Sequence, residues 1–530
     1  MNASPNDLMI PAETVGGETP EVLRVEFRRN MGQISRHSVA FFAGTLFTMC
    51  VGYLVKIYVA RVLGAELLGI YALGMTLVSL TQLVGCLGLN SAAARYVAVY
   101  NATRRFDDLR GFLTRSVGIV FFLNLVLSIG LVFSGGWLAR HLYHAPGLVP
   151  YIPLFAVLTI LGALNVFCCQ VLAGFKDIAK RTIITNFIGT SFVSALSVGL
   201  LAFGTGMVGY LWAQILNSII VVALLVAVAW KLTPKGARLS WAPLPPLDPE
   251  IKAFAAAALG MGALDFLVTQ ADKILLGLYL NPTLVGIYVV ASTLSALIPL
   301  ILQSVNQIFA PVIADLHAQN RRDVLERLFQ TLTKWVLGLS LPLSFVVIAF
   351  ALPLMRIFGR GFEPGWPVLV IGVVGQIVNC SVGSVGYLLL MSGNQQRLIR
   401  VQFVMVGVSL LVNITLIPLL GVVGAALAAA LVNAASNFWN LFQVRQALGI
   451  FPYNRSYFAL AIPAAFAAAI VTLVRFGTVS LNRQWMVILA ALVISYVAFG
   501  VCALKFSLDA DDRMIASSAW AQARGMLRRR

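Results

Sequence analysis

The sequence predicts an all-α polytopic membrane protein with about 14 transmembrane helices: two parallel six-helix repeats followed by two further helices. Three observations support this fold class. The 530 residues are 59% hydrophobic and only 11% charged, and the mean hydropathy of +0.89 exceeds what a soluble globular chain needs. Apolar segments of about 20 residues, the length that crosses a bilayer, alternate with basic connections. A long stretch of the first half also recurs in the second half.

Fourteen apolar segments are the predicted spans. They are 38–60, 67–89, 112–138, 149–172, 181–203, 207–230, 253–280, 284–308, 329–353, 366–391, 399–419, 421–444, 457–476 and 485–505. Only Pro418 and Gly421 divide the stretch 399–444, and the division of the last pair is also weak. Twelve spans is therefore the alternative number.

The repeat is defined by a constant offset. Residues 56–71, KIYVARVLGAELLGIY, recur without a gap as residues 273–288, KILLGLYLNPTLVGIY, which lie 217 positions later. Farther along, the GMVG that begins at Gly206 matches the GVVG that begins at Gly421, at the slightly different offset of 215. An offset kept over such a length indicates a duplicated architectural unit. Because six spans is an even number, both halves should enter the membrane in the same direction, related by a two-fold axis along the membrane normal.

The repeat and the composition together define the predicted domains. These are a cytoplasmic N-terminal tail at 1–37, a six-helix lobe at 38–230, a linker at 231–250, a second six-helix lobe at 251–447, two extra helices at 448–505 and a basic cytoplasmic tail at 506–530. The linker is polar and rich in proline, which favours a semi-extended connection. The two extra helices have no counterpart in the repeat, and the sequence leaves their role open.

Basic residues fall mainly on one side of the predicted membrane. Of the 38 Lys and Arg, 30 lie on the side of the N-terminus, six on the other side and two within spans. Loops rich in Lys and Arg remain cytoplasmic, so both termini are predicted to be cytoplasmic. The net charge of +18 therefore reflects topology and anionic lipid rather than nucleic-acid binding.

Four ionisable residues lie inside predicted spans: Lys56, Asp265, Asp272 and Lys273. A charge at the bilayer centre costs roughly 2.5–3.5 kcal/mol, so these side chains should face an aqueous cavity or one another. Asp265 lies near the middle of its span and is a candidate for coupling to a proton or sodium gradient, as is Asp272. Two other interpretations stay open: the lysines reach the headgroups, or Asp272 neutralises Lys273.

A polar stripe lies on the predicted twelfth span. Asn433, Ser436, Asn437 and Asn440 are spaced three or four residues apart, which places them on one helix face. Such a face should point away from lipid, because unsatisfied amides in hydrocarbon are costly. Asn433 and Asn437 are candidates for binding sugar hydroxyls; the alternative is hydrogen bonding between helices, worth about 0.6 kcal/mol per bond.

The sequence lacks the usual signatures of catalysis. It contains no P-loop, the six cysteines have no CxxC spacing and all lie in apolar runs, and no paired carboxylates occupy an outer loop. We therefore predict a protein that is not an enzyme and that uses no cofactor or metal.

Residues 60–89 resemble the start of the polysaccharide flippases in the multidrug/oligosaccharidyl-lipid/polysaccharide exporter superfamily. Arg61, Leu63-Gly64 and Gly69-Ile70-Tyr71 match the family pattern. Asp272-Lys273-Ile274, followed by Gly286-Ile287-Tyr288, is similar to its second-half version, and GVVGAALA from Gly421 is similar to the family's G-x-x-G-A-A-x-A. The resemblance covers about residues 35–505.

This resemblance implies a flippase that moves undecaprenyl-diphosphate-linked oligosaccharide across a bacterial inner membrane by alternating access. Lys56, Lys273 and Arg61 would then attract the diphosphate. A polysaccharide polymerase and chain-length machinery would be partners. The alternatives are a multidrug/cation antiporter, a flippase for a lipid-linked peptidoglycan precursor, a membrane glycosyltransferase or polymer ligase, and an assembly scaffold.

Overall fold

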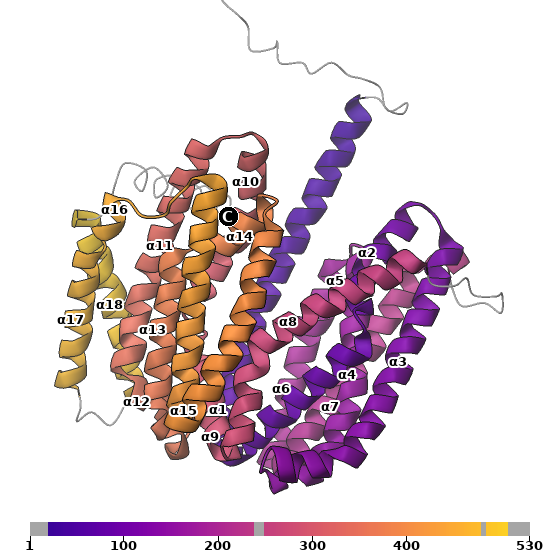
Figure 1. Ribbon diagram of the computed structural model, residues 1–530, viewed down its shortest axis with the longest axis horizontal. Helices are drawn as coiled ribbons and strands as arrows, with labels where there is room; N and C mark the ends of the chain where they lie inside the picture. The colour runs from indigo at the N-terminus through magenta and orange to yellow at the C-terminus, as the bar shows by residue number, and fades with distance from the viewer. Residues whose placement is uncertain (1–19, 238–247, 479–483, 507–530) are drawn as a thin grey trace, which may run out of the picture.

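The computed structural model describes residues 20–237, 248–478 and 484–506 (Figure 1). The first part of the predicted tail 1–37, the centre of the predicted linker and residues 507–530 of the predicted basic tail lie outside the described residues. The described residues form helices and connections, without a strand. The prediction of an all-α fold is confirmed.

The described residues of the first half of the chain form seven α-helices. They are α1 (Pro20–Cys86), α2 (Leu89–Ala102), α3 (Phe106–Trp137), α4 (Ile152–Gly174), α5 (Ile178–Thr182), α6 (Thr190–Ala202) and α7 (Gly206–Leu232). A π-helical segment, Ile183–Gly189, joins α5 to α6. We call α1 to α7 the N-lobe.

From residue 248 to residue 448, all of which the structure describes, there are eight α-helices that we call the C-lobe. They are α8 (Pro249–Tyr279), α9 (Pro282–Ser295), α10 (Leu300–Ala318), α11 (Arg322–Ala349), α12 (Ala351–Phe358), α13 (Trp366–Val382), α14 (Val385–Met391) and α15 (Gln395–Leu448). After α16 (Arg455–Phe458), the helices α17 (Ala461–Gly477) and α18 (Gln484–Phe506) pack against each other and against α11.

The number of membrane crossings agrees with the sequence prediction. In the described ranges, eleven helical segments are long and apolar enough to cross a membrane, and α9 with the start of α10 forms a bent twelfth. Two of the eleven, 44–86 and α15, contain 43 and 54 residues. At 1.5 Å per residue they would extend ~65 and ~80 Å, more than twice the bilayer core of about 30 Å. Each therefore crosses twice, which gives the fourteen crossings expected.

Glycines with positive φ mark where these two helices break. Gly64 has a φ of 78° and Gly421 a φ of 59°, values that residues with a Cβ rarely adopt. Gly206, which the repeat aligns with Gly421, has a φ of 60°. Each half thus has a glycine with positive φ at the start of its sixth predicted span.

Three predicted boundaries differ from the structure. The first helix begins at Pro20, well before the predicted start at residue 38, so the predicted tail is partly helical. The predicted span 284–308 is bent by 50° between α9 and α10. The predicted span 366–391 is interrupted at Gly383, whose φ of 76° ends α13. Uninterrupted hydropathy cannot reveal a break made by one residue.

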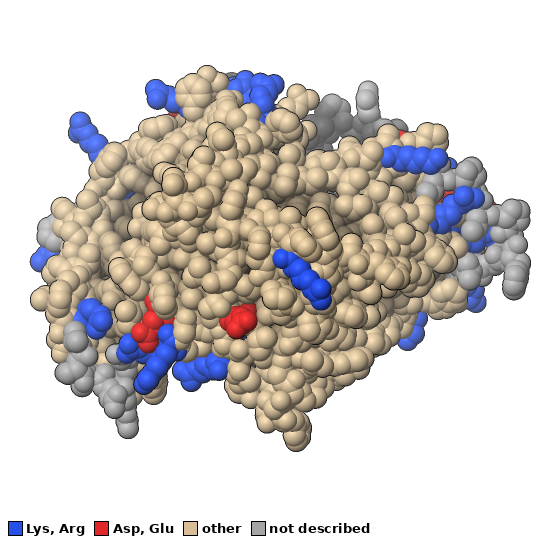
Figure 2. Space-filling model, turned by 60° about the horizontal axis from the view of Figure 1, so that its bottom comes forward, with Lys and Arg blue, Asp and Glu red and all other residues tan. Residues whose placement is uncertain are grey.

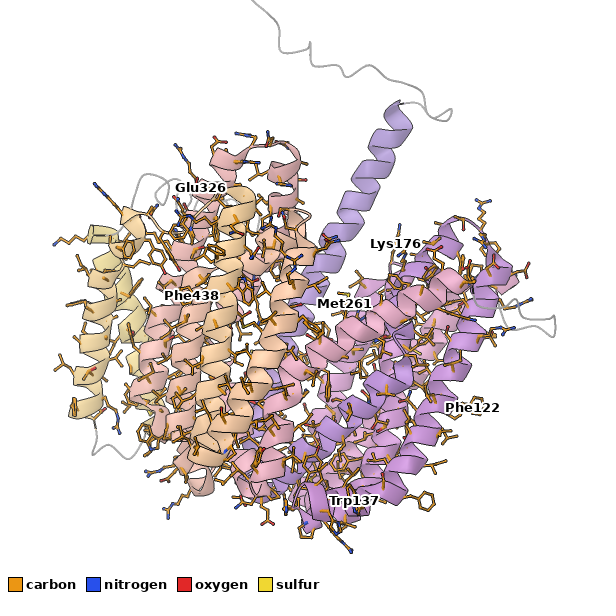
Figure 3. All side chains as sticks on the ribbon, in the orientation of Figure 1. Phe122, Trp137, Lys176, Met261, Glu326 and Phe438 are labelled. Atoms are coloured by element: carbon orange, nitrogen blue, oxygen red, sulfur yellow. The ribbon has the colours of Figure 1, made fainter. Side chains whose placement is uncertain are left out.

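The two lobes meet mainly at one end of the molecule. The contact between α1 and α9 is the most extensive between the lobes, and it lies where α1 turns at Gly64 and α9 begins. We call this the junction end, where Trp137 lies; Lys176 and Glu326 lie at the opposite end, which we call the basic end (Figure 3). In Figure 1 the lobes converge at the junction end and diverge toward the basic end.

The outer surface is suited to lipid. Large apolar side chains project from the helices, among them Phe122 and Phe438, which are 64% and 51% exposed. Figure 2, in which the junction end comes forward, shows a mostly uncharged surface with scattered charged side chains. The structure is that of a multi-pass membrane protein; the compartment that each end faces stays a prediction.

Candidate functional site: two cavities around α8 and α9

The start of α9 is built for close contact with the N-lobe. Asn281 caps the helix, because its side chain accepts a hydrogen bond from Leu284 N at 3.0 Å, and Pro282 occupies the first helical position. One turn later, Gly286 lies against the backbone oxygen of Ala65 in the N-lobe. A bond from Tyr53 Oη to Thr293 O, 2.9 Å long, ties α1 to α9 nearer the membrane centre.

An inter-lobe cavity of about 360 Å³ lies beside this junction, and both predicted lysines line it. Lys56 reaches it from α1 and Lys273 from α8, with Tyr71, Thr76 and Gln270 among the other lining residues. The sequence repeat therefore places its two cations in one cavity. Both lysines thus line a cavity between the lobes, and their role in binding stays a prediction.

Few protein groups neutralise the two lysines. Lys273 Nζ donates to Gln270 Oε1 at 2.8 Å and to Thr269 O at 3.2 Å, which are both uncharged acceptors. Lys56 Nζ lies 5.9 Å from the ring centroid of Tyr53, and the two ammonium groups repel each other. A cavity with two cations and neutral partners is suited to an anion of more than one negative charge.

Arg61 does not line this cavity. Its Nε donates to Ile357 O at 2.6 Å, which joins the N-lobe to α12 at the junction end. Its exposed guanidinium is thus engaged with the opposite lobe rather than grouped with Lys56. Sequence alone did not reveal this, although Arg61 is five residues after Lys56 on the same helical segment and so projects from a different face of the helix.

A second cavity, of about 400 Å³, lies within the C-lobe. Asp272 lines it together with Asn433 and Ser436 of the predicted polar stripe, and further polar side chains come from α9, α13 and α15. These are Tyr288, Ser292, Ser295, Gln376, Asn379, Gln402, Ser409 and Asn413. Asp272 is therefore not an ion-pair partner of Lys273: consecutive residues of α8 line two different cavities.

The oxygen atoms of this C-lobe cavity suit a small cation. Asp272 Oδ2 accepts a bond of 2.7 Å from Tyr288 Oη. Asn413 is 2% exposed, and its Oδ1 has no hydrogen-bond partner among the described residues. A buried amide oxygen without a donor costs about 1–3 kcal/mol unless a ligand satisfies it. Carboxylate, amide and hydroxyl oxygens are the ligands that hard cations prefer.

The two predicted sugar-binding asparagines differ in position. Asn433 lines the C-lobe cavity, and its Nδ2 lies 3.4 Å from Gly375 O. Asn437 instead donates to Asn433 O and Oδ1, at 2.9 and 2.8 Å, within the same helix. The stripe faces the C-lobe interior, and Asn437 supports Asn433 rather than lining the cavity.

Asp265 lines neither of the two cavities. Its side chain is exposed on the middle of α8, one turn before Thr269, whose hydroxyl donates to Asp265 O. The ionisable residue nearest the polar C-lobe side chains is Asp272 instead. Depth in the span, the argument that favoured Asp265, does not say which way a side chain points.

Sequence reasoning missed Asn413 and the partner role of Tyr288. Tyr288 was visible only as a repeated residue, and Asn413 as a single amide in an apolar segment. One signal was available: Asn413 and Ser409 are four residues apart on one face, the spacing that identified the Asn433 stripe.

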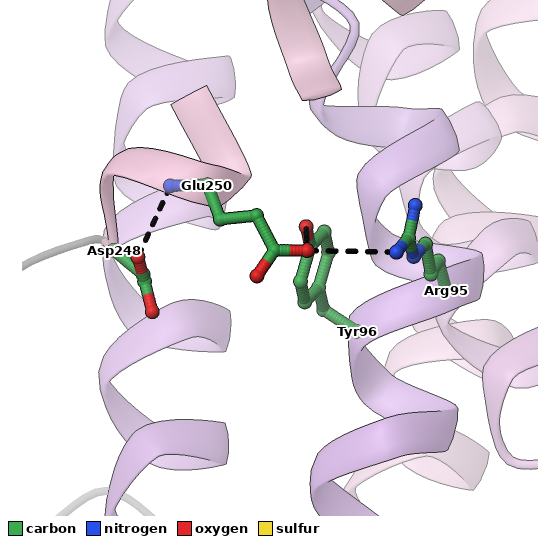
Figure 4. A network of polar contacts seen from close by, with 4 residues as sticks. All are labelled: Arg95, Tyr96, Asp248 and Glu250. Atoms are coloured by element: carbon green, nitrogen blue, oxygen red, sulfur yellow. Dashed lines mark hydrogen bonds and ion pairs between the residues drawn. The ribbon is translucent and has the colours of Figure 1, made fainter. Parts of the chain in front are cut away.

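A polar network at the basic end joins α8 to the N-lobe (Figure 4). Glu250 Oε1 accepts from Tyr96 Oη at 3.1 Å and pairs with Arg95 at 3.5 Å, while Asp248 caps α8 through Glu250 N. The Arg95 guanidinium also lies 4.9 Å from the ring of Phe254. Burial, and then the bond to Glu250, raise the pKa of Tyr96, so its hydroxyl remains a donor.

These features define a helical multi-pass membrane protein with two lobes and polar cavities between its helices. A family model described as "Polysaccharide biosynthesis protein" matches residues 58–364, more than half of the chain. The chain belongs to this family of polysaccharide biosynthesis proteins. The resemblance identified from Arg61, Gly69-Ile70-Tyr71 and their second-half counterparts is confirmed.

Known proteins of similar sequence and fold agree with this assignment. The "Probable flippase AglR" of Haloferax volcanii is 23% identical over 416 residues, covering 76% of this chain and 81% of that protein. The inward closed structure of the lipid II flippase MurJ superposes with a TM-score of 0.67 at 13% identity, covering 87% of this chain and 98% of MurJ. An inward-facing multidrug resistance MATE family transporter of the MOP superfamily has a TM-score of 0.60 at 15% identity, covering 76% and 94%. The chain thus has the fold of MOP superfamily transporters.

Proposed function

We propose that this protein is a flippase for undecaprenyl-diphosphate-linked oligosaccharides, which it moves from the cytoplasmic to the periplasmic leaflet of a bacterial inner membrane. The product would supply surface or exopolysaccharide synthesis, with a polymerase and chain-length machinery as partners. Membership of the polysaccharide biosynthesis family and similarity to a probable flippase support this proposal. The shared fold with a lipid II flippase is consistent with it.

The observation that carries the proposal is the pair of repeat-related lysines in one inter-lobe cavity. Lys56 and Lys273 are two compact positive charges, and a diphosphate diester carries two negative charges that they can neutralise. The cavity lies between the lobes, so opening one end or the other exposes it to opposite sides of the membrane. The polyprenyl chain would stay in lipid while the headgroup crosses.

Coupling to an ion gradient is assigned to the C-lobe cavity. Asp272 supplies the negative charge, and Asn413 supplies a neighbouring oxygen without a donor, for a sodium ion or a proton. Asn433 lines the same cavity, so we place it with the ion rather than with the sugar. Asp265, exposed on the middle of α8, is the second candidate for the coupling residue.

Alternating access follows from where the lobes touch. The junction end is held by backbone contact between α1 and α9, and the basic end is joined by the network of Arg95 and Glu250. With both termini cytoplasmic, as the 30 basic residues on one side predict, the junction end would be periplasmic and closed in this arrangement.

One alternative is favoured by a specific observation. The superposition with MurJ is consistent with transport of a lipid-linked peptidoglycan precursor, which the same two lysines could bind. A multidrug/cation antiporter would share the fold of the MATE transporters, but two cavity lysines would repel a cationic drug. Resistance to cationic dyes and rescue of a strain depleted of its lipid II flippase distinguish these functions.

Polymer export in a strain that lacks its native flippase tests the proposal. Lys56→Ala and Lys273→Ala should abolish export while the amount of protein in the membrane is unchanged. Lys176→Ala is the matched control, because Lys176 lies at the basic end, away from both cavities (Figure 3). Export at the wild-type level in both lysine variants would rule out the diphosphate site.

A further inference from the structure

Tyr288 connects the C-lobe cavity to the contact between the lobes. Its hydroxyl donates to Asp272 Oδ2 at 2.7 Å, and its side chain is buried, with 2% exposed. It lies on α9 only two residues after Gly286, which rests on the Ala65 backbone. Its hydroxyl is therefore on the cation side of α9, while the neighbouring turn of that helix forms the junction.

The repeat shows that this connection belongs to one lobe only. Tyr71 occupies the position equivalent to Tyr288, and its ring packs edge-on against Tyr210 with 5.0 Å between centroids. The position equivalent to Asp272 is Val55, which offers no acceptor. Of the two equivalent tyrosines, Tyr288 of the C-lobe is thus hydrogen-bonded to a carboxylate, whereas Tyr71 of the N-lobe packs against another aromatic ring.

Both oxygens of the Asp272 carboxylate already have donors. Oδ2 accepts from Tyr288 Oη, and Oδ1 accepts from the backbone N of Lys273 at 2.8 Å. A cation that uses the oxygen of Asn413 must compete with these donors for the carboxylate. The backbone N–H of a helix cannot turn away, whereas a phenol can, so Tyr288 is the donor that a cation would displace.

Displacing Tyr288 weakens the attachment of α9 to α8. The bond to Asp272 crosses between these two helices, and α9 is also the C-lobe helix that contacts α1 most extensively. Lys273, the neighbour of Asp272, lines the inter-lobe cavity. Cation binding at Asp272 can therefore affect the lobe junction through one hydrogen bond, to Tyr288. It can affect the inter-lobe cavity through one peptide bond, to Lys273.

We propose that Tyr288 is the positioning residue that transmits cation binding at Asp272 to the lobe junction. Bonded to Asp272, it holds α9 against α8 and favours the closed junction. A cation on the carboxylate releases it, so α9 loosens and the arrangement with an open junction gains population. This inference rests on the ion coupling included in the proposed function and assigns its transmission to one hydroxyl.

The distance between the lobes at the basic end reports this equilibrium. Spin labels at Ala102→Cys and Gln319→Cys occupy exposed, repeat-equivalent positions of the two lobes, and Cys50 and Cys502 are replaced by serine to avoid labelling them. The experiment uses purified full-length protein in lipid nanodiscs, in a choline buffer as the cation-free reference. In one comparison sodium replaces choline, and in the other the choline buffer is made acidic. Opening the junction should bring the labels closer, which double electron–electron resonance measures.

In the otherwise wild-type labelled protein, one of the two cations should shift the ratio of the lobe arrangements about tenfold, within the usual range of allosteric coupling. Tyr288→Phe, which removes only the hydroxyl, should favour the shorter distance without cation, and the cation should shift the ratio less than about twofold. Tyr71→Phe, the matched change in the N-lobe, should respond as the wild type does.

The possible results distinguish the role of Tyr288 from ion coupling itself. A Tyr288→Phe protein that follows the cation as the wild type does overturns the role of Tyr288 while leaving ion coupling intact. A wild-type protein that responds to neither sodium nor acid overturns ion coupling itself. Should Tyr288→Phe fail to fold, Asp272→Asn replaces it: the amide still accepts from Tyr288, so the junction should stay closed and ignore the cation, and a response there overturns the inference.

Discussion

Gly69 and Gly286 pack against each other across the lobe junction, and each contacts the helical turn that precedes the other. They are separated by 217 residues, as are the backbone groups that they contact, so the contact is reciprocal: Gly69 rests on Pro282 and Gly286 on Ala65. A reciprocal contact between equivalent residues places a pseudo-two-fold axis between them. The stretch with the clearest sequence repeat is thus the surface through which the two halves meet.

A methyl group at this contact should open the junction. A Cβ on Gly286 would lie 1.9 Å from Ala65 O, and one on Gly69 would lie 1.7 Å from Pro282 O. Because a backbone oxygen cannot rotate away, Gly286→Ala should destabilise the closed junction by about 1–3 kcal/mol. The inter-lobe distance distribution measures this shift. Gly130→Ala is the control, since a Cβ there meets no atom within 4 Å, and an unchanged distribution for Gly286→Ala would contradict the axis.

The ion pair at the basic end should affect the lobe arrangement more than the folding stability. Arg95 and Glu250 are 51% and 67% exposed, so their pairing contributes less than about 1 kcal/mol to folding. They nevertheless join α8 to the N-lobe (Figure 4). Glu250→Arg should release this attachment and lengthen the distance between the lobes at the basic end. Adding Arg95→Glu exchanges the two charges, so the ion pair and the wild-type distance should return.

A double-mutant cycle of these two changes gives the coupling energy directly. Arg105 and Asp108 provide the control, because they form an ion pair of 2.7 Å inside the N-lobe. Exchanging their charges should leave the inter-lobe distance unchanged. If the single Glu250→Arg variant keeps the wild-type distance as well, α8 is not held by this network.

Removing the unsatisfied amide of the C-lobe cavity should separate stability from ion binding. Asn413→Leu replaces a buried oxygen that lacks a donor, so the cation-free protein should gain about 1 kcal/mol. The variant should also lose the thermal stabilisation that the cation gives, which is about 2.7 kcal/mol at a hundred times the dissociation constant. Thermal unfolding with sodium, with choline and at acidic pH measures both effects. Cation stabilisation equal to that of the wild type would place the ion elsewhere.

Sequence reasoning reached the architecture because lipid imposes simple rules on it. Span length and the 217-residue offset predicted fourteen crossings and two like halves, and the offset also linked Lys56 to Lys273. The helix breaks at Gly64 and Gly383 could not be predicted, because the sequence does not distinguish a glycine that continues a helix from one with positive φ that ends it.

The candidate site was predicted in part, for a related reason. The periodicity of the Asn433 stripe predicted an inward face correctly, but depth in the span favoured Asp265 over Asp272. Whether a carboxylate faces a cavity depends on the rotation of α8 against its neighbours. That rotation is set by contacts with helices distant in sequence, such as the bond between Asp272 and Tyr288.

The most direct test of the account measures flipping by purified protein in vesicles that contain an undecaprenyl-diphosphate oligosaccharide. The rate at which the sugar becomes accessible to an added glycosidase should fall at least about 30-fold in Lys56→Ala and in Lys273→Ala, because each substitution leaves a buried phosphate charge without its partner. Lys176→Ala should keep the wild-type rate. Wild-type rates in both cavity variants would contradict the claim that the two repeat-related lysines bind the diphosphate.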